Sequence, residues 1–152
     1  MSTATDYLDY RISPRIKIAA LWTSTLFIFI SVDLFSLYRA DVRADIEAGR
    51  VAAFTIGQGY LLGVIVYLAV PSLMLFLSLI LPVKLTRVAN IVLAAVYALT
   101  ILGSAIGEWS YFIVGSGIEA ALLGAIAYYA WAWPRATQGA AVLPRETAVL
   151  TK

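Results

Sequence analysis

The sequence contains no cysteine and no histidine. Their absence excludes disulfides, thiol redox chemistry, imidazole general bases, and metal or haem sites that depend on Cys or His ligands. Charge is scarce too, because only 13% of the 152 residues are Asp, Glu, Lys or Arg, whereas a soluble domain has about 25%. Hydrophobic residues make up 62% of the chain. This composition predicts an integral membrane protein in the lipid bilayer, and we expect no cofactor and no bound metal.

Four apolar segments are long enough to cross a bilayer, which takes about 20 helical residues. They cover about residues 18–38, 54–81, 88–106 and 110–133. Prolines mark their ends, because Pro14 precedes the first segment, Pro82 follows the second and Pro134 follows the fourth. We therefore predict a single membrane domain over residues 1–152, built as an all-α, antiparallel four-helix transmembrane bundle. The polar tail over 135–152 is expected to be disordered.

The positive charges predict how the chain crosses the membrane. Eight of them fall on one side, namely Arg11, Arg15, Lys17, Lys84, Arg87, Arg135, Arg145 and Lys152, and three fall on the other, namely Arg39, Arg43 and Arg50. The positive-inside rule then predicts that both termini lie in the cytoplasm. We expect the membrane to be the inner (plasma) membrane. Because these charges are spread singly and form no basic stripe, we expect no nucleic-acid partner.

The outer segment over 39–53 has two interpretations. Alternating apolar residues from Ala40 to Ile46 suit a strand, whereas Val42 and Ile46 at i,i+4, followed by Gly49 as a stop, suit a short helix on the outer surface. The residue types favour the helix. The short connection over 107–109 predicts that the third and fourth spans form an antiparallel hairpin.

Small residues recur at i,i+4 in three of the spans. The pairs are Gly59 with Gly63, Gly103 with Gly107, Gly117 with Ala121, and Ala120 with Gly124. Such pairs let helix backbones approach closely in lipid, either across a homodimer face or within the four-helix bundle.

A proline interrupts the second span. Pro71 predicts a kink that is either a static bend or a hinge. Ser72 or Ser78 is expected to repair the interrupted hydrogen bonding.

Two acids lie inside predicted spans. Asp33 and Glu119 are expected at similar depths in the outer half of the membrane, and both should face the bundle interior because a carboxylate in hydrocarbon is costly. Gln58, Tyr60 and Ser104 could add hydrogen bonds to the same cluster. No Lys or Arg lies within a predicted span to neutralise the acids.

This polar cluster has three interpretations. The acids stay neutral and fix helix register, or they bind a cation or relay protons, or they orient the polar end of a lipophilic ligand. We predict a membrane protein of unknown activity, non-enzymatic, with an intramembrane ion or small-ligand site. The alternative is a lipid-modifying or isomerising enzyme that uses the same carboxylates. A polar path from the cluster to Asn90 would favour transport, a closed pocket of several hundred cubic ångströms would favour a ligand, and a filled core would favour the structural role.

Short strings from Ile16 to Pro134 carry a family resemblance. They are Ala20–Ser24, Asp33 with Leu37–Tyr38, Pro71–Met74, Phe76–Leu79, Asn90–Leu93, Ile118–Glu119 and Tyr129–Trp131. On these strings the chain resembles a bacterial family of uncharacterised four-span membrane proteins, classed as a domain of unknown function. The resemblance implies the same architecture and offers no reaction or substrate. A looser similarity, in size and span number alone, is to small membrane proteins of the DoxX-like kind.

Overall fold

The computed structural model describes residues 12–134, so the predicted tail over 135–152 lies outside the described residues. The elements are α1 (Pro14–Ser36), α2 (Ala40–Glu47), β1 (Arg50–Val51), β2 (Phe54–Thr55), α3 (Gln58–Ile80), α4 (Val83–Ser104) and α5 (Ser110–Trp131). Helices α1, α3, α4 and α5 are each long and apolar enough to cross a membrane. The predicted all-α, four-span class is confirmed, and the span limits differ from the predicted ones by a few residues.

The helix ends coincide with residues whose backbone chemistry starts or stops a helix. The hydroxyl of Ser13 accepts a backbone N–H in the first turn of α1 at 3.4 Å, and Pro14 occupies the first helical position. Pro82, which has no N–H to donate, separates α3 from α4. Gly49 and Gly107 have φ values of +75° and +82°, which glycine adopts most easily, and they follow α2 and α4 as predicted.

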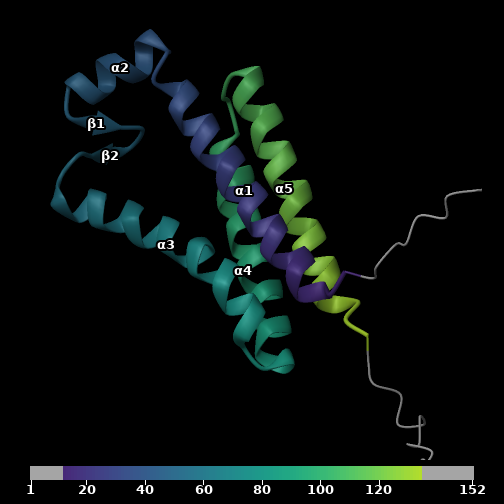
Figure 1. The fold of residues 1–152 in the computed structure, drawn as a ribbon. Helices are drawn as coiled ribbons and strands as arrows, with labels where there is room; N and C mark the ends of the chain where they lie inside the picture. The colour runs from purple at the N-terminus through teal and green to yellow at the C-terminus, as the bar shows by residue number, and fades with distance from the viewer. Residues whose placement is uncertain (1–11, 135–152) are drawn as a thin grey trace, which may run out of the picture.

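Helix α5 packs against both α1 and α4, and α1 also packs against α3 (Figure 1). Trp22, Leu123 and Ile126 are fully buried at the centre of this arrangement. Helices α1 and α5 approach closely at Gly115, where an added Cβ would lie only 2.3 Å from Cγ2 of Val32. Glycine is required at this position because no larger side chain fits without moving a helix.

Helix α3 leaves the bundle over its N-terminal half. Figure 1 shows its C-terminal half against the other spans and its N-terminal half leaning away from them, with α2 and the two short strands bridging from α1 to the start of α3. Pro71 is the first buried residue along this helix. Figure 1 shows the helix bent between a packed half and a splayed half, which agrees with the kink predicted from this proline.

The segment between α1 and α3 contains both a helix and a hairpin. The predicted surface helix is confirmed as α2, and the strand interpretation of residues 40–46 is wrong. Two residues further on, β1 pairs antiparallel with β2, an element that was not predicted. The second span begins at Gln58, so the predicted start at Phe54 is wrong. Phe54 is apolar and was therefore assigned to the span, but it belongs to β2. The ring of Phe54 stacks on Tyr60 with centroids 6.0 Å apart, which attaches the hairpin to α3.

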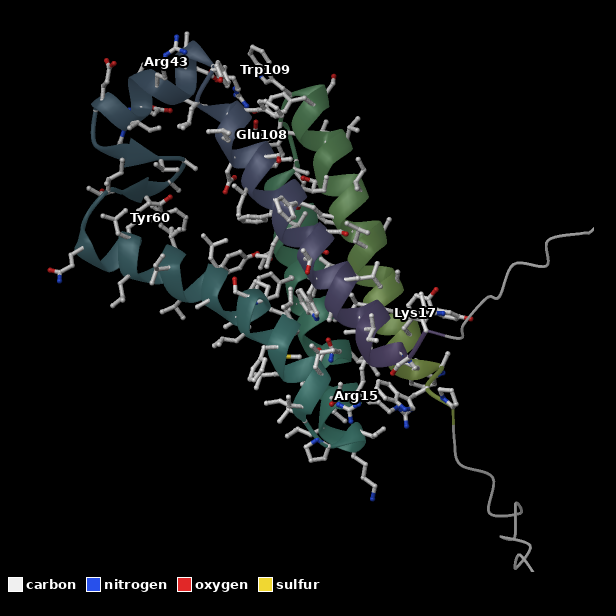
Figure 2. The ribbon with its side chains drawn as sticks, in the orientation of Figure 1. Arg15, Lys17, Arg43, Tyr60, Glu108 and Trp109 are labelled. Atoms are coloured by element: carbon white, nitrogen blue, oxygen red, sulfur yellow. The ribbon has the colours of Figure 1, made fainter. Side chains whose placement is uncertain are left out.

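Arginines attach the ends of the helices to their neighbours. Arg15 donates to two carbonyls in the last turn of α3 at 3.1 and 3.0 Å, and Arg87 donates to two carbonyls at the end of α5 at 2.9 and 3.1 Å. These carbonyls have no partner within their own helix, so the guanidinium groups cap them. In Figure 2, Arg15 and Lys17 lie at one end of the molecule, while Arg43, Glu108 and Trp109 lie at the other.

Candidate functional site

A cavity of about 790 Å³ lies among α1, β2, α3, α4 and α5, in the half of the spans nearest the hairpin, and it is partly open to its surroundings, not the closed pocket considered in the sequence analysis. Its polar lining residues are Asp33, Thr55, Tyr60, Tyr67, Thr100, Ser104, Ser116 and Glu119, and its aromatic lining also includes Phe29, Phe54 and Phe112. The splayed half of α3 forms one wall, so the bend at Pro71 creates the space.

Four of the five residues predicted for the site line this cavity. They are Asp33 on α1, Tyr60 on α3, Ser104 on α4 and Glu119 on α5. Gln58, the fifth, is an exposed residue at the first position of α3 and does not line the cavity. Four helices therefore bring polar groups to one space, as the matching depths of the two acids predicted.

Glu119 is the unusual residue of the lining. Only 3% of the residue is exposed, and its Oε1 atom has no hydrogen-bond partner among the described residues. Asp33 is exposed, on the α1 wall of the same cavity. The ion pairs within residues 12–134 join Arg39 to Asp41 and Glu108, and Arg50 to Asp45, so they leave both acids out. The buried Oε1 of Glu119 thus lines the cavity without a partner among the described residues, and neither acid is in an ion pair there.

Tyr97 stabilises the bend of α3. A proline cannot donate to the carbonyl four residues earlier, and for Pro71 that carbonyl belongs to Tyr67. The hydroxyl of Tyr97 on α4 donates to the Tyr67 carbonyl at 2.5 Å. The prediction that Ser72 or Ser78 makes this repair is wrong, because Ser72 donates to Leu68 within its own helix and Ser78 bonds to Asn90.

The cavity wall is closed between α3 and α4 by a second hydrogen bond. The hydroxyls of Tyr67 and Thr100 lie 2.7 Å apart. Trp22 and Tyr97 pack edge to face, with ring centroids 6.1 Å apart. They border a void of about 10 Å³, whose lining is mostly apolar and which is no larger than one water.

Asn90 lies on the far side of Trp22 and belongs to a separate polar cluster. Its Oδ1 accepts from the indole N–H of Trp22 at 2.7 Å, and its amide donates to Ser78 at 3.1 Å and to the Thr86 carbonyl at 2.8 Å. The cavity lining does not include Asn90. Among the described residues, the polar groups of the cavity and those around Asn90 are therefore separated by the buried rings of Trp22 and Tyr97.

Glycines shape the α3 wall of the cavity. Gly59 and Gly63 both line it, and a Cβ added at either position would meet no atom within 4 Å. Gly103, Gly117 and Gly124 also have open space where a Cβ would be. The predicted packing of these glycines within the bundle is therefore wrong, and Gly115, which was not singled out, makes the close contact.

The sequence analysis did not single out some of the lining residues. Ser116 lies one helical turn before Glu119, so the i,i+3 spacing would have found it. Tyr67 lies one turn before Pro71, which is the position whose carbonyl a proline leaves free. Thr55 gave no such signal, because it reaches the cavity through the unpredicted hairpin.

These features define a four-span helical membrane protein with a cavity among its spans, lined by two acids from different helices. Residues 8–140 match the Family of unknown function (DUF6326), and the chain belongs to this family. No curated protein and no solved structure matched the chain.

Proposed function

We propose that the protein binds a small lipophilic ligand in the cavity, and that Asp33 and Glu119 orient the polar end of that ligand. The observation that carries this proposal is the buried Oε1 of Glu119, which lines a cavity of about 790 Å³ and has no partner among the described residues. A buried polar atom without a hydrogen bond costs about 1–3 kcal/mol. Cavities of about 300–1,000 Å³ with a few convergent polar groups are typical of small-molecule sites.

The other interpretations of the acids have less support. A purely structural acid would donate a hydrogen bond to another helix, and Glu119 Oε1 makes none within the described residues. A transport path would connect the cavity with Asn90, and the buried rings of Trp22 and Tyr97 lie between them. An enzyme that modifies or isomerises a lipid would use the same carboxylates, and recovery of a chemically changed ligand would identify it.

The test of the proposal is a variant that fills the cavity without touching the acids. Gly63 lines the cavity, so Gly63→Phe places a ring in the space beside α3. Gly103→Phe is the control, because a Cβ there also meets no atom within 4 Å but Gly103 does not line the cavity. Wild type and both variants are purified in nanodiscs, and their bound small molecules are analysed by native mass spectrometry. We expect a ligand in wild type and Gly103→Phe, with loss in Gly63→Phe. The same molecules on all three proteins would refute a ligand-binding cavity.

The proposed location is the plasma membrane, with both termini in the cytoplasm. The support is the distribution of Lys and Arg over the chain, with Arg15 and Lys17 at the end of the bundle where α1 begins, and Arg43 at the other end (Figure 2). A bacterial source, the DoxX-like similarity and a homodimer remain predictions from the sequence.

A further inference from the structure

We propose that the ligand of the cavity is a lipophilic cation, such as an amphiphilic amine or an onium compound, whose charge lies between Asp33 and Glu119. This inference rests on the proposed ligand-binding function and adds the chemical class of the ligand. Its basis is the charge and aromatic content of the cavity lining.

The lining holds acids and no base. Asp33 and Glu119 come from α1 and α5, and no Lys or Arg is among the residues that line the cavity. The arginines of the described chain are used elsewhere: Arg15 and Arg87 cap helix ends, and Arg39 pairs with Asp41 and Glu108. An anionic ligand would therefore meet two acidic groups with no compensating charge, whereas a cation would supply the missing partner.

Aromatic rings line the same cavity as the two acids. Phe29 and Tyr67 pack with centroids 5.8 Å apart, and Phe54 and Tyr60 stack at 6.0 Å, with all four residues lining the cavity. The faces of aromatic rings carry partial negative charge and attract cations, including quaternary ammonium groups that cannot donate hydrogen bonds. Acids and rings together thus favour positive charge on the ligand.

The apolar part of the lining requires a lipophilic ligand. Val32, Val64, Leu68 and Ile101 contribute aliphatic surface, and the splayed half of α3 carries exposed Leu61 on its surface. A small hydrated cation would leave this surface in contact with water. Hydrocarbon attached to the cation would bury it, which is favourable by about 25 cal/mol per Å² of apolar surface. The cavity volume of about 790 Å³ accommodates a molecule of drug size.

The experiment compares phenyl-substituted probes of different charge: a cation and an anion of the same shape, and a neutral compound with one ring fewer. Wild-type protein in nanodiscs of neutral lipid is titrated with tetraphenylphosphonium, with neutral triphenylphosphine oxide, and with tetraphenylborate, and binding to empty nanodiscs is subtracted. We expect saturable binding of tetraphenylphosphonium at least about tenfold tighter than of triphenylphosphine oxide, and no saturable binding of the borate anion.

Variants then locate the charge recognition. Glu119→Gln and Asp33→Asn each keep the size of the side chain, and each should weaken tetraphenylphosphonium binding by about tenfold or more while changing triphenylphosphine oxide binding little. The control is Asp45→Asn, which removes an acid paired with Arg50 outside the cavity and should leave both affinities unchanged. Unfolding temperatures check that each variant folds, and if one acid variant does not fold, the other decides the result.

The outcomes separate this inference from the proposed function. Suppose that both probes bind with equal affinity, that Gly63→Phe abolishes their binding, and that the acid substitutions leave both affinities unchanged. The cavity then binds ligands, but the cation inference is overturned. If tetraphenylphosphonium binding survives both acid substitutions, the inference is overturned as well. If neither probe binds, or if Gly63→Phe changes the binding of neither, the cation inference is overturned, and the ligand-binding proposal is decided by the molecules bound to wild type, Gly63→Phe and Gly103→Phe.

Discussion

The hydroxyl of Tyr97 donates to the backbone carbonyl of Tyr67 at 2.5 Å, across the boundary between α4 and α3. That carbonyl lies four residues before Pro71 and therefore lacks its helical donor. A side chain of one span thus stabilises the bend of another. Because the splayed half of α3 forms a wall of the cavity, this hydrogen bond connects the stability of the bundle with the shape of the candidate site.

The first prediction is a coupling between Tyr97 and Pro71. Tyr97→Phe leaves the Tyr67 carbonyl without a donor and should lower the free energy of unfolding by about 1 kcal/mol. Pro71→Ala restores a backbone N–H to the same carbonyl, so Tyr97→Phe should cost much less in the Pro71→Ala protein. Denaturant titrations of the four proteins give the coupling energy.

A matched control uses a different tyrosine. Tyr111 at the outer end bonds through its hydroxyl to Ser36 at 2.9 Å, far from the bend in sequence. Tyr111→Phe should cost the same with and without Pro71→Ala. If Tyr97→Phe also costs the same free energy of unfolding with and without Pro71→Ala, Tyr97 does not stabilise the bend at Pro71.

The second prediction concerns Asn90. Asn90→Ala removes the partners of the Trp22 indole N–H and of Ser78, both in a buried environment, and should destabilise the protein by about 1–3 kcal/mol. Thr23→Ala is the control, since the Thr23 hydroxyl bonds only to a carbonyl of its own helix. Equal unfolding temperatures for the two variants would show that the Asn90 cluster contributes nothing to stability.

Much of the fold could be predicted from the sequence because hydropathy and proline act locally. Pro14 and Pro82 mark helix ends within a few residues of where they occur, and Gly107 marks the α4–α5 turn. The hairpin could not be predicted, because Phe54 is apolar enough to extend the neighbouring span and two-residue strands leave no periodic pattern.

The candidate site was predictable in part, because its two acids stand out locally in the sequence. Asp33 and Glu119 stand out because acids are rare in spans, and helical rise places them at similar depths. Gln58 does not line the cavity, although Thr55 and Gly59 on either side of it in the sequence do. The contact between Tyr97 and Tyr67 joins residues 30 positions apart, and its existence depends on how α3 and α4 are rotated, which one sequence does not reveal.

The third prediction concerns Asp41 in α2, outside the spans. The hydrogen bond from the Arg39 guanidinium lowers the pKa of Asp41 below its ordinary value of 3.8. Because the pKa of Asp41 is lower in the folded protein than in the unfolded one, the pair stabilises the fold at pH values above the unfolded-state pKa. This stabilisation is lost as the pH falls through the folded-state pKa. NMR titration of labelled Asp side chains should show the pKa of Asp41 rising toward its ordinary value in Arg39→Gln, since the Arg39 hydrogen bond is the largest cause of the shift. No change on that substitution would show that the pair does not form in solution.

The fourth prediction concerns topology. Cysteines introduced at Ala48, at Lys84 and at Ala136 should respond differently to an impermeant maleimide added to intact cells, because the first lies in the outer segment and the other two are expected in the cytoplasm. Labelling is expected at Ala48 alone. The native chain has no cysteine, so it provides the blank. Labelling at Lys84 and Ala136 but not at Ala48 would reverse the orientation.

The last prediction tests the homodimer. Gly117, Ala121 and Gly124 are exposed on α5, and a Cβ at either glycine meets nothing within 4 Å, so these residues leave a face open to lipid or to a second copy. In a dimer across this face, leucines at both glycines would separate the backbones and remove close dispersion contacts. Gly117→Leu combined with Gly124→Leu should then convert dimer to monomer in native mass spectrometry without lowering the unfolding temperature. Gly103→Leu, equally open but on α4, should leave the dimer intact. Wild type that is monomeric at every protein-to-lipid ratio would rule out the dimer.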